Sequence, residues 1–107
     1  MDTLSKLSQN GLHLDYEEVV KVCEKYSLSE LSIFGSALRS DFHADSDVDI
    51  LISFQDDSES TLTDILDLKE YFESLFHRNV DILEKDALRN PIRKQNILST
   101  YEVIYAV

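Results

Sequence analysis

The sequence is poor in residues that cross-link a chain or break its regular structure. Among 107 residues it has one cysteine, one proline, two glycines and no tryptophan. A lone cysteine cannot form an internal disulfide, which suits the reducing cytoplasm. Low glycine and proline contents argue against a disordered or loop-rich chain. We therefore expect one folded, cytoplasmic domain over residues 1–107.

Long apolar runs and basic residues are also scarce. No run approaches the roughly 20 apolar residues of a membrane-spanning helix, and the N-terminus lacks the plan of a signal peptide. Ten Lys and Arg residues face 21 Asp and Glu residues, which gives a net charge of −11. Affinity for nucleic-acid backbones comes from Lys and Arg, so direct nucleic-acid binding is disfavoured. The acidity favours metal recruitment and a basic protein partner.

Apolar residues recur at helical or strand spacing along most of the chain. Residues 1–11 are weakly patterned, and we expect a loose lead-in or a short helical turn there. Beyond them we expect helices over residues 16–26, 36–40, 62–76 and 91–97 and strands over 28–34, 47–54, 79–83 and, as a strand or an extended tail, 102–106. This alternation predicts an α/β fold whose helices cover one side of a sheet.

Ten residues separate a Gly-Ser pair, Gly35-Ser36, from the first of two aspartates, Asp47 and Asp49. The apolar residues at alternate positions of 48–54 share one strand face, which leaves both aspartates on the other face. Adjacent carboxylates repel each other, and a hard divalent cation such as Mg²⁺ is the usual compensator. Gly35 and Ser36 can bring backbone amides and a hydroxyl close to a phosphate. The stretch therefore predicts a nucleotide-handling site.

This spacing resembles the signature of the polymerase-beta-type nucleotidyltransferase superfamily. The small size of the chain resembles the minimal nucleotidyltransferase (MNT) branch of that superfamily. Residues 79–83, Asn-Val-Asp-Ile-Leu, are similar to the strand that carries the third carboxylate, here Asp81. The segment from Asn90 to Tyr105 also resembles the end of such a domain. The resemblance implies a polymerase-beta-like fold, with a small mixed sheet flanked by helices.

The resemblance also implies a set of site residues. Three carboxylates would be catalytic and would hold two Mg²⁺ ions, or Mn²⁺ in their place: Asp47, Asp49 and Asp81. Four further residues would contact ATP: Gly35, Ser36, Arg39 and Ser46. Plainer interpretations exist for several of them. The Asp pair can be a turn feature, Asp81 an exposed strand residue, Arg39 a surface residue and Ser36 a helix cap.

Members of this branch are usually paired with a HEPN-domain partner in prokaryotic toxin–antitoxin modules. The resemblance therefore implies an antitoxin that transfers AMP from ATP to a tyrosine hydroxyl of a HEPN-family RNase. That modification would silence the RNase, and the two proteins would form a hetero-oligomer. Two alternatives stay open: a non-catalytic antitoxin that acts by binding, and a nucleotidyltransferase that acts on a small-molecule acceptor.

Overall fold

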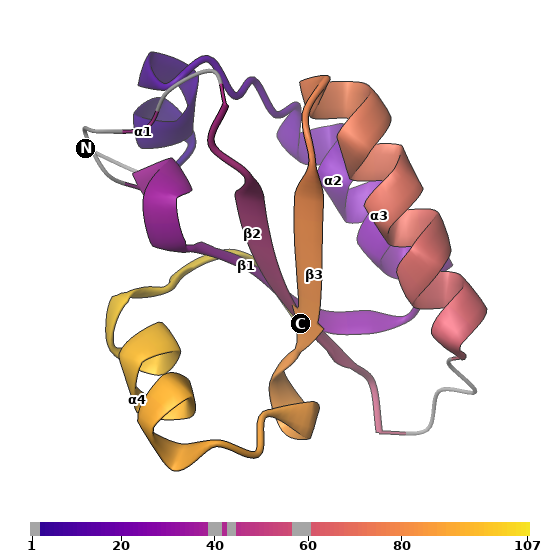
Figure 1. Ribbon diagram of the computed structural model, residues 1–107. Coiled ribbons are helices and arrows are strands. Elements are labelled where there is room, and N and C mark those ends of the chain that lie inside the picture. Colours follow the sequence, from indigo (N-terminus) through magenta and orange to yellow (C-terminus); the bar gives the residue numbers. More distant parts are fainter. Residues whose placement is uncertain (1–2, 39–41, 43–44, 57–60) are drawn as a thin grey trace.

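The computed structural model of the chain describes residues 3–38, 42, 45–56 and 61–107. Its elements in chain order are α1 (Thr3–Gln9), α2 (Tyr16–Lys25), β1 (Leu28–Phe34), the 3₁₀ helix η1 (Gly35–Leu38), β2 (Val48–Phe54), α3 (Leu62–Phe76), β3 (Val80–Glu84), the 3₁₀ helix η2 (Lys85–Ala87), α4 (Pro91–Thr100) and β4 (Glu102–Ala106) (Figure 1). None of the helices described is long and apolar enough to cross a membrane.

In these parts of the chain the strands form one four-stranded sheet in the order β3-β2-β1-β4. Strand β1 pairs antiparallel with both β2 and β4, whereas β2 and β3 pair in parallel. Parallel neighbours need a crossover connection, and α3 provides it. The predicted small mixed sheet is thus confirmed. Its strand order, which the sequence could not decide, places the two aspartate-bearing strands β2 and β3 side by side.

Local capping signals fix where two of the helices begin. At the start of α3, Thr61 and Asp64 form a capping box in which the Thr61 N–H donates to Asp64 Oδ2 at 3.1 Å. At the start of α4, Asn90 Oδ1 accepts from the Ile92 N–H at 3.0 Å. Pro91 takes the first helical position. Its lack of an N–H costs nothing there, because an N–H at this position has no acceptor within the helix. Both helix starts agree with the sequence-based prediction.

One face of the sheet is covered by α1, α2 and α3, and the main core lies between these layers (Figure 1). Residues 1–11 were expected to be a loose lead-in or a short helical turn, and the structure has the seven-residue helix α1 there, whose Leu7 side chain is completely buried. Other members of this core with an exposed fraction of 1% or less are Leu12, Val19, Cys23, Leu28, Leu31, Ile33, Ala37, Val48, Ile50, Ile52, Leu68 and Phe72. The first helix is therefore an integral part of the fold.

The opposite face carries a smaller cluster formed by Phe34, Leu51 and Ile97. Ile50 and Leu51 are consecutive strand residues, so they point to opposite faces of the sheet. Because α4 contributes Ile97, it lies on the face away from α2 and α3. The expectation that all helices cover one side is therefore wrong for α4. Ile97 is its only buried residue, and one position gives too weak a pattern to assign a face.

Three large apolar residues near the ends of α2 and α3 are exposed. The exposed fractions are 48% for Tyr16, 70% for Leu62 and 39% for Leu75. Each lies in the first or last turn of its helix. Apolar residues at the ends of a helix can therefore keep the helical spacing and still lie beyond the reach of the core.

Candidate active site

The Gly-Ser turn lies directly against the carboxylate of Asp49. Gly35 follows the last residue of β1, and its φ of +75° falls in the left-handed region that favours glycine. A Cβ atom added to Gly35 would lie 2.5 Å from Asp49 Oδ2. The β1–β2 pairing causes this proximity, since Asp49 is the register partner of Phe34. Glycine is thus required here both by the backbone conformation and by the space that the carboxylate occupies.

The third predicted carboxylate, Asp81, lies beside Asp49 on the sheet. The two residues are register partners in the parallel β2–β3 pair. Partners on adjacent strands point to the same face and are about 5 Å apart. Asp49 is two residues from Leu51, so this face is the one on which α4 packs. Asp49 is half-buried and Asp81 is exposed. The fold therefore brings two of the three predicted catalytic carboxylates together next to Gly35.

The remaining aspartate, Asp47, precedes the first residue of β2 and is exposed. Both of its neighbours are hydrogen-bonded to the turn between α3 and β3. Arg78 Nη1 donates to the Ser46 carbonyl at 3.2 Å, and the Val48 N–H donates to the Asn79 carbonyl at 3.0 Å. A pocket of about 220 Å³ at this point is lined by Asp45, Ser46, Asp47, His77, Arg78 and Asn79.

The donor chemistry of these aspartates suits Mg²⁺ or Mn²⁺, because both ions prefer carboxylate oxygens. Within the described residues, however, no three His, Cys, Asp or Glu side chains are grouped closely enough to hold a metal ion. The structure shows Asp49 and Asp81 as a pair, with Asp47 near the start of the same strand. The assignment of all three as metal ligands stays a prediction.

Two predicted nucleotide contacts fall wholly or partly outside the described part of the chain. Ser36 lies in η1, but only its backbone is described. Arg39 lies outside the described residues altogether. Their assignments also stay predictions, as does that of Ser46, which is half-buried beside Asp47.

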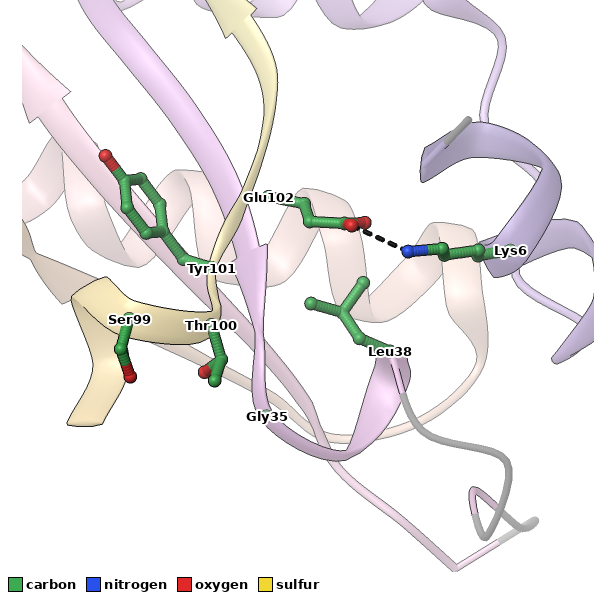
Figure 2. Close-up of a pocket in the computed structure, with 7 residues that line it drawn as sticks. All are labelled: Lys6, Gly35, Leu38, Ser99, Thr100, Tyr101 and Glu102. Atoms are coloured by element: carbon green, nitrogen blue, oxygen red, sulfur yellow. Dashed lines mark hydrogen bonds and ion pairs between the residues drawn. The ribbon is translucent and has the colours of Figure 1, made fainter. Parts of the chain in front are cut away.

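A cavity of about 520 Å³ adjoins Gly35 on the side of β4 (Figure 2). Figure 2 shows that its walls come from α1, η1 and the junction of α4 with β4; the lining residues are Lys6, Gly35, Leu38, Ser99, Thr100, Tyr101 and Glu102. Lys6 Nζ and Glu102 Oε1 are 2.7 Å apart and connect α1 to β4. The sequence analysis missed this cavity, because Lys6 and Glu102 are 96 positions apart and belong to no motif.

A small polar network holds one wall of that cavity. Lys85 Nζ lies 3.4 Å from Glu30 Oε1 and 3.3 Å from Tyr101 Oη. Partial burial acts to lower the pKa of the Lys85 ammonium group, but the hydrogen bond with Tyr101 and the charge of Glu30 outweigh it and raise the pKa overall. Lys85 therefore stays charged near neutral pH, and its contacts tie Tyr101 to β1 and η2.

Known proteins resemble the chain in sequence over most of its length. The family profile described as "Nucleotidyltransferase domain" matches residues 18–104. The protein adenylyltransferase MntA of Thermococcus cleftensis is 35% identical over 82 residues, which are 77% of this chain and 78% of the relative.

Solved structures share the fold. A candidate minimal nucleotidyltransferase superposes with a TM-score of 0.69 at 29% identity and covers 95% of both chains. A complex of a tri-AMPylated Shewanella oneidensis HEPN toxin with an MNT antitoxin gives a TM-score of 0.61 at 14% identity, covering 94% of this chain and 73% of the matched chain. At that identity the second likeness concerns the fold alone. The predicted minimal nucleotidyltransferase fold is thus confirmed.

Proposed function

Because the chain belongs to the nucleotidyltransferase domain family, we propose that it is a protein adenylyltransferase that acts as an antitoxin. It transfers AMP from ATP to a tyrosine hydroxyl of a HEPN-family RNase toxin and so neutralises the toxin. A relative named protein adenylyltransferase and a fold neighbour solved with an AMPylated HEPN toxin support this proposal. The observation that carries it is the Asp49 carboxylate, which lies against Gly35 and in register with Asp81.

In this proposal the phosphates of ATP lie over the turn at Gly35 and Ser36. Backbone amides at such a turn can donate to phosphate oxygens, and the missing side chain at Gly35 lets a phosphate come close. The same glycine adjoins the cavity beside η1, so a bound triphosphate has space next to it on that side. Arg39 neutralises negative charge as pyrophosphate leaves, and Ser46 contacts the nucleotide beside Asp47.

The carboxylates act at the reacting phosphate. Asp49 and Asp81, with Asp47 nearby, would hold two Mg²⁺ ions, which when bound stabilise negative charge on the phosphate oxygens. Asp81 is exposed on the edge strand β3, where an acceptor hydroxyl can reach it, and it accepts the hydroxyl proton. The tyrosine oxygen forms a bond to the α-phosphorus, the bond from that phosphorus to the bridging oxygen breaks, and pyrophosphate leaves.

The partner in this proposal is a protein rather than a nucleic acid or a membrane. A chain with a net charge of −11 repels phosphate backbones but is attracted to a basic protein surface. We propose that the chain and its toxin form a hetero-oligomer in the cytoplasm, in which the acceptor tyrosine is presented to Asp81.

Toxin neutralisation in cells distinguishes catalysis from binding alone. Wild type and the double variant Asp47→Asn/Asp49→Asn are co-expressed with the HEPN-family toxin. A double variant with the same loss of two charges on α3, Asp67→Asn/Glu70→Gln, serves as the control. We expect wild type and control to protect growth, and the Asp47/Asp49 variant to bind the toxin without protecting. Equal protection by that variant would mean that neutralisation needs no catalysis.

A further inference from the structure

Asp47 lies outside the regular pairing of the sheet, yet its backbone is held on both sides. It precedes β2, and its side chain is exposed. The carbonyl before it, on Ser46, accepts from Arg78, and the N–H after it, on Val48, donates to Asn79. Two consecutive residues of the α3–β3 turn therefore clamp the backbone around one aspartate.

The turn that supplies this clamp is itself fixed. His77 ends α3 in the left-handed conformation, with φ of +56°, and its N–H donates to the Glu73 carbonyl at 2.9 Å. The Glu73 side chain then accepts from the Val80 N–H at 3.1 Å, which joins the end of α3 to the start of β3. Because Phe76 is buried in the main core, the turn is anchored to that core.

Arg78 uses two properties of its guanidinium group at once. The guanidinium carbon lies 4.5 Å from the centre of the Phe42 ring, and Nη1 donates to Ser46 at 3.2 Å. A planar guanidinium can stack on an aromatic ring while its edge donates, whereas a lysine ammonium offers neither the plane nor the fixed fork. Arg78 thereby connects Phe42, Ser46 and the α3–β3 turn. Its charge also faces the same small pocket as Asp45 and Asp47.

We propose that Arg78 is a positioning residue for Asp47. By holding the Ser46 carbonyl and stacking on Phe42, it fixes the segment that enters β2 and thus the direction of the Asp47 carboxylate. The consequence for AMP transfer rests on the proposed function, but the positioning itself does not. A misplacement of a reacting group by about 1 Å can cost on the order of 100-fold in rate.

The test compares Arg78→Ala, Arg78→Lys and the charge-matched control Arg93→Ala, which alters an exposed residue of α4. Amide hydrogen exchange of the Val48 N–H, measured by NMR, reports the clamp directly. We expect exchange at Val48 to be at least 10-fold faster in Arg78→Ala and intermediate in Arg78→Lys. Exchange at Leu31, in the middle of the sheet, should stay unchanged in all three variants. Unchanged exchange at Val48 in Arg78→Ala would overturn the proposal.

The kinetic readout uses the HEPN-family toxin and ATP with Mg²⁺. We expect kcat to fall roughly 10- to 100-fold in Arg78→Ala and less in Arg78→Lys, while KM for ATP changes little and Arg93→Ala matches wild type. A fall in stability without a Val48-specific change in exchange would indicate a merely structural role and contradict the proposal. If Arg78→Ala does not fold, the Val48 exchange rates of Arg78→Lys and wild type are compared instead, and equal rates would overturn the proposal. If wild type itself transfers no AMP, the proposed function fails, and the exchange measurement still decides the positioning.

Discussion

Gly35 and Gly11 have nearly the same backbone conformation but different surroundings. Their φ angles are +75° and +82°, so an alanine at either position is strained. A Cβ atom at Gly11 would have no neighbour within 4 Å, whereas one at Gly35 would lie 2.5 Å from Asp49 Oδ2. Comparing the two positions separates the cost of the backbone conformation from the cost of displacing the Asp49 carboxylate.

We predict that Gly35→Ala destabilises the fold more than Gly11→Ala does and also impairs AMP transfer. The conformational strain costs about 1–2 kcal/mol at each position. At Gly35 the added methyl group must also displace the Asp49 carboxylate, which adds to this cost and moves the carboxylate from its place at the site. Urea unfolding measures both free energies of unfolding. Activity should fall at least tenfold in Gly35→Ala only. Equal effects of the two substitutions on activity would mean that Gly35 does not serve the site.

The lone cysteine has no role at the site but reports on the core. Cys23 is completely buried, and burial, with a smaller contribution from the charge of Glu24, raises the pKa of its thiol from 9.0 to about 12. Above about pH 9 the unfolded chain loses the thiol proton while the folded chain keeps it. The unfolded state then binds fewer protons, so stability must decrease as the pH rises towards 12.

We therefore predict that the free energy of unfolding falls more steeply between pH 9 and pH 10.5 in wild type than in Cys23→Ala. Burial also raises the pKa values of Tyr71 and Tyr105. Tyr71 contributes equally in both proteins, whereas the charge of Cys23 adds to the rise at Tyr105, so its loss in Cys23→Ala changes the slope in the same direction. Urea unfolding at several pH values provides the slopes. Equal slopes of the free energy of unfolding against pH in the two proteins would show that the thiol is not buried as described.

At the scale of elements, features set by neighbouring residues could be predicted from the sequence, whereas features set by contacts between distant segments could not. The starts of α3 and α4 followed from Thr61, Asp64, Asn90 and Pro91, because a cap is formed by residues only a few positions apart. The side of the sheet on which α4 packs depends on contacts with β1 and β2, which no local pattern encodes. The burial of α1 likewise arises from contacts with distant segments.

The same division holds for the candidate site. The alternation in residues 48–54 places Asp49 on the face of its strand opposite the main core. The resemblance to the nucleotidyltransferase family implied a third carboxylate, Asp81, on another strand. The register of Asp49 with Asp81 could be known only from the pairing of β2 with β3. The cavity beside Gly35 combines residues from opposite ends of the chain, so its walls could not be predicted.

The integral role of α1 leads to a stability prediction. Leu7→Ala removes a completely buried side chain and should cost about 2–5 kcal/mol in the free energy of unfolding. The same change at Ile92, which is 73% exposed on α4, should cost less than about 0.5 kcal/mol. Urea unfolding of both variants gives the comparison. Similar small losses would mean that the N-terminal segment is the loose lead-in that its sequence suggests.

At the scale of the whole molecule, the chain is small and acidic, and among its described residues the site aspartates Asp47 and Asp81 are exposed. The main core lies on the side of α1, α2 and α3, and α4 packs on the other side near Leu51. Exposed Asp81 on edge strand β3 therefore stays accessible to a partner of the chain. A small domain with an exposed carboxylate at its site is suited to modifying a side chain that another protein presents.

The most direct test of AMP transfer is the intact mass of the HEPN-family partner after incubation with this chain, ATP and Mg²⁺. We predict that the partner gains one or more adenylyl groups with wild type, and none with Asp49→Asn or without Mg²⁺. Tryptic mapping of the modified partner should then place the added mass on a tyrosine. A partner that forms a stable complex with wild type yet gains no mass would contradict protein adenylyl transfer as the function of this chain.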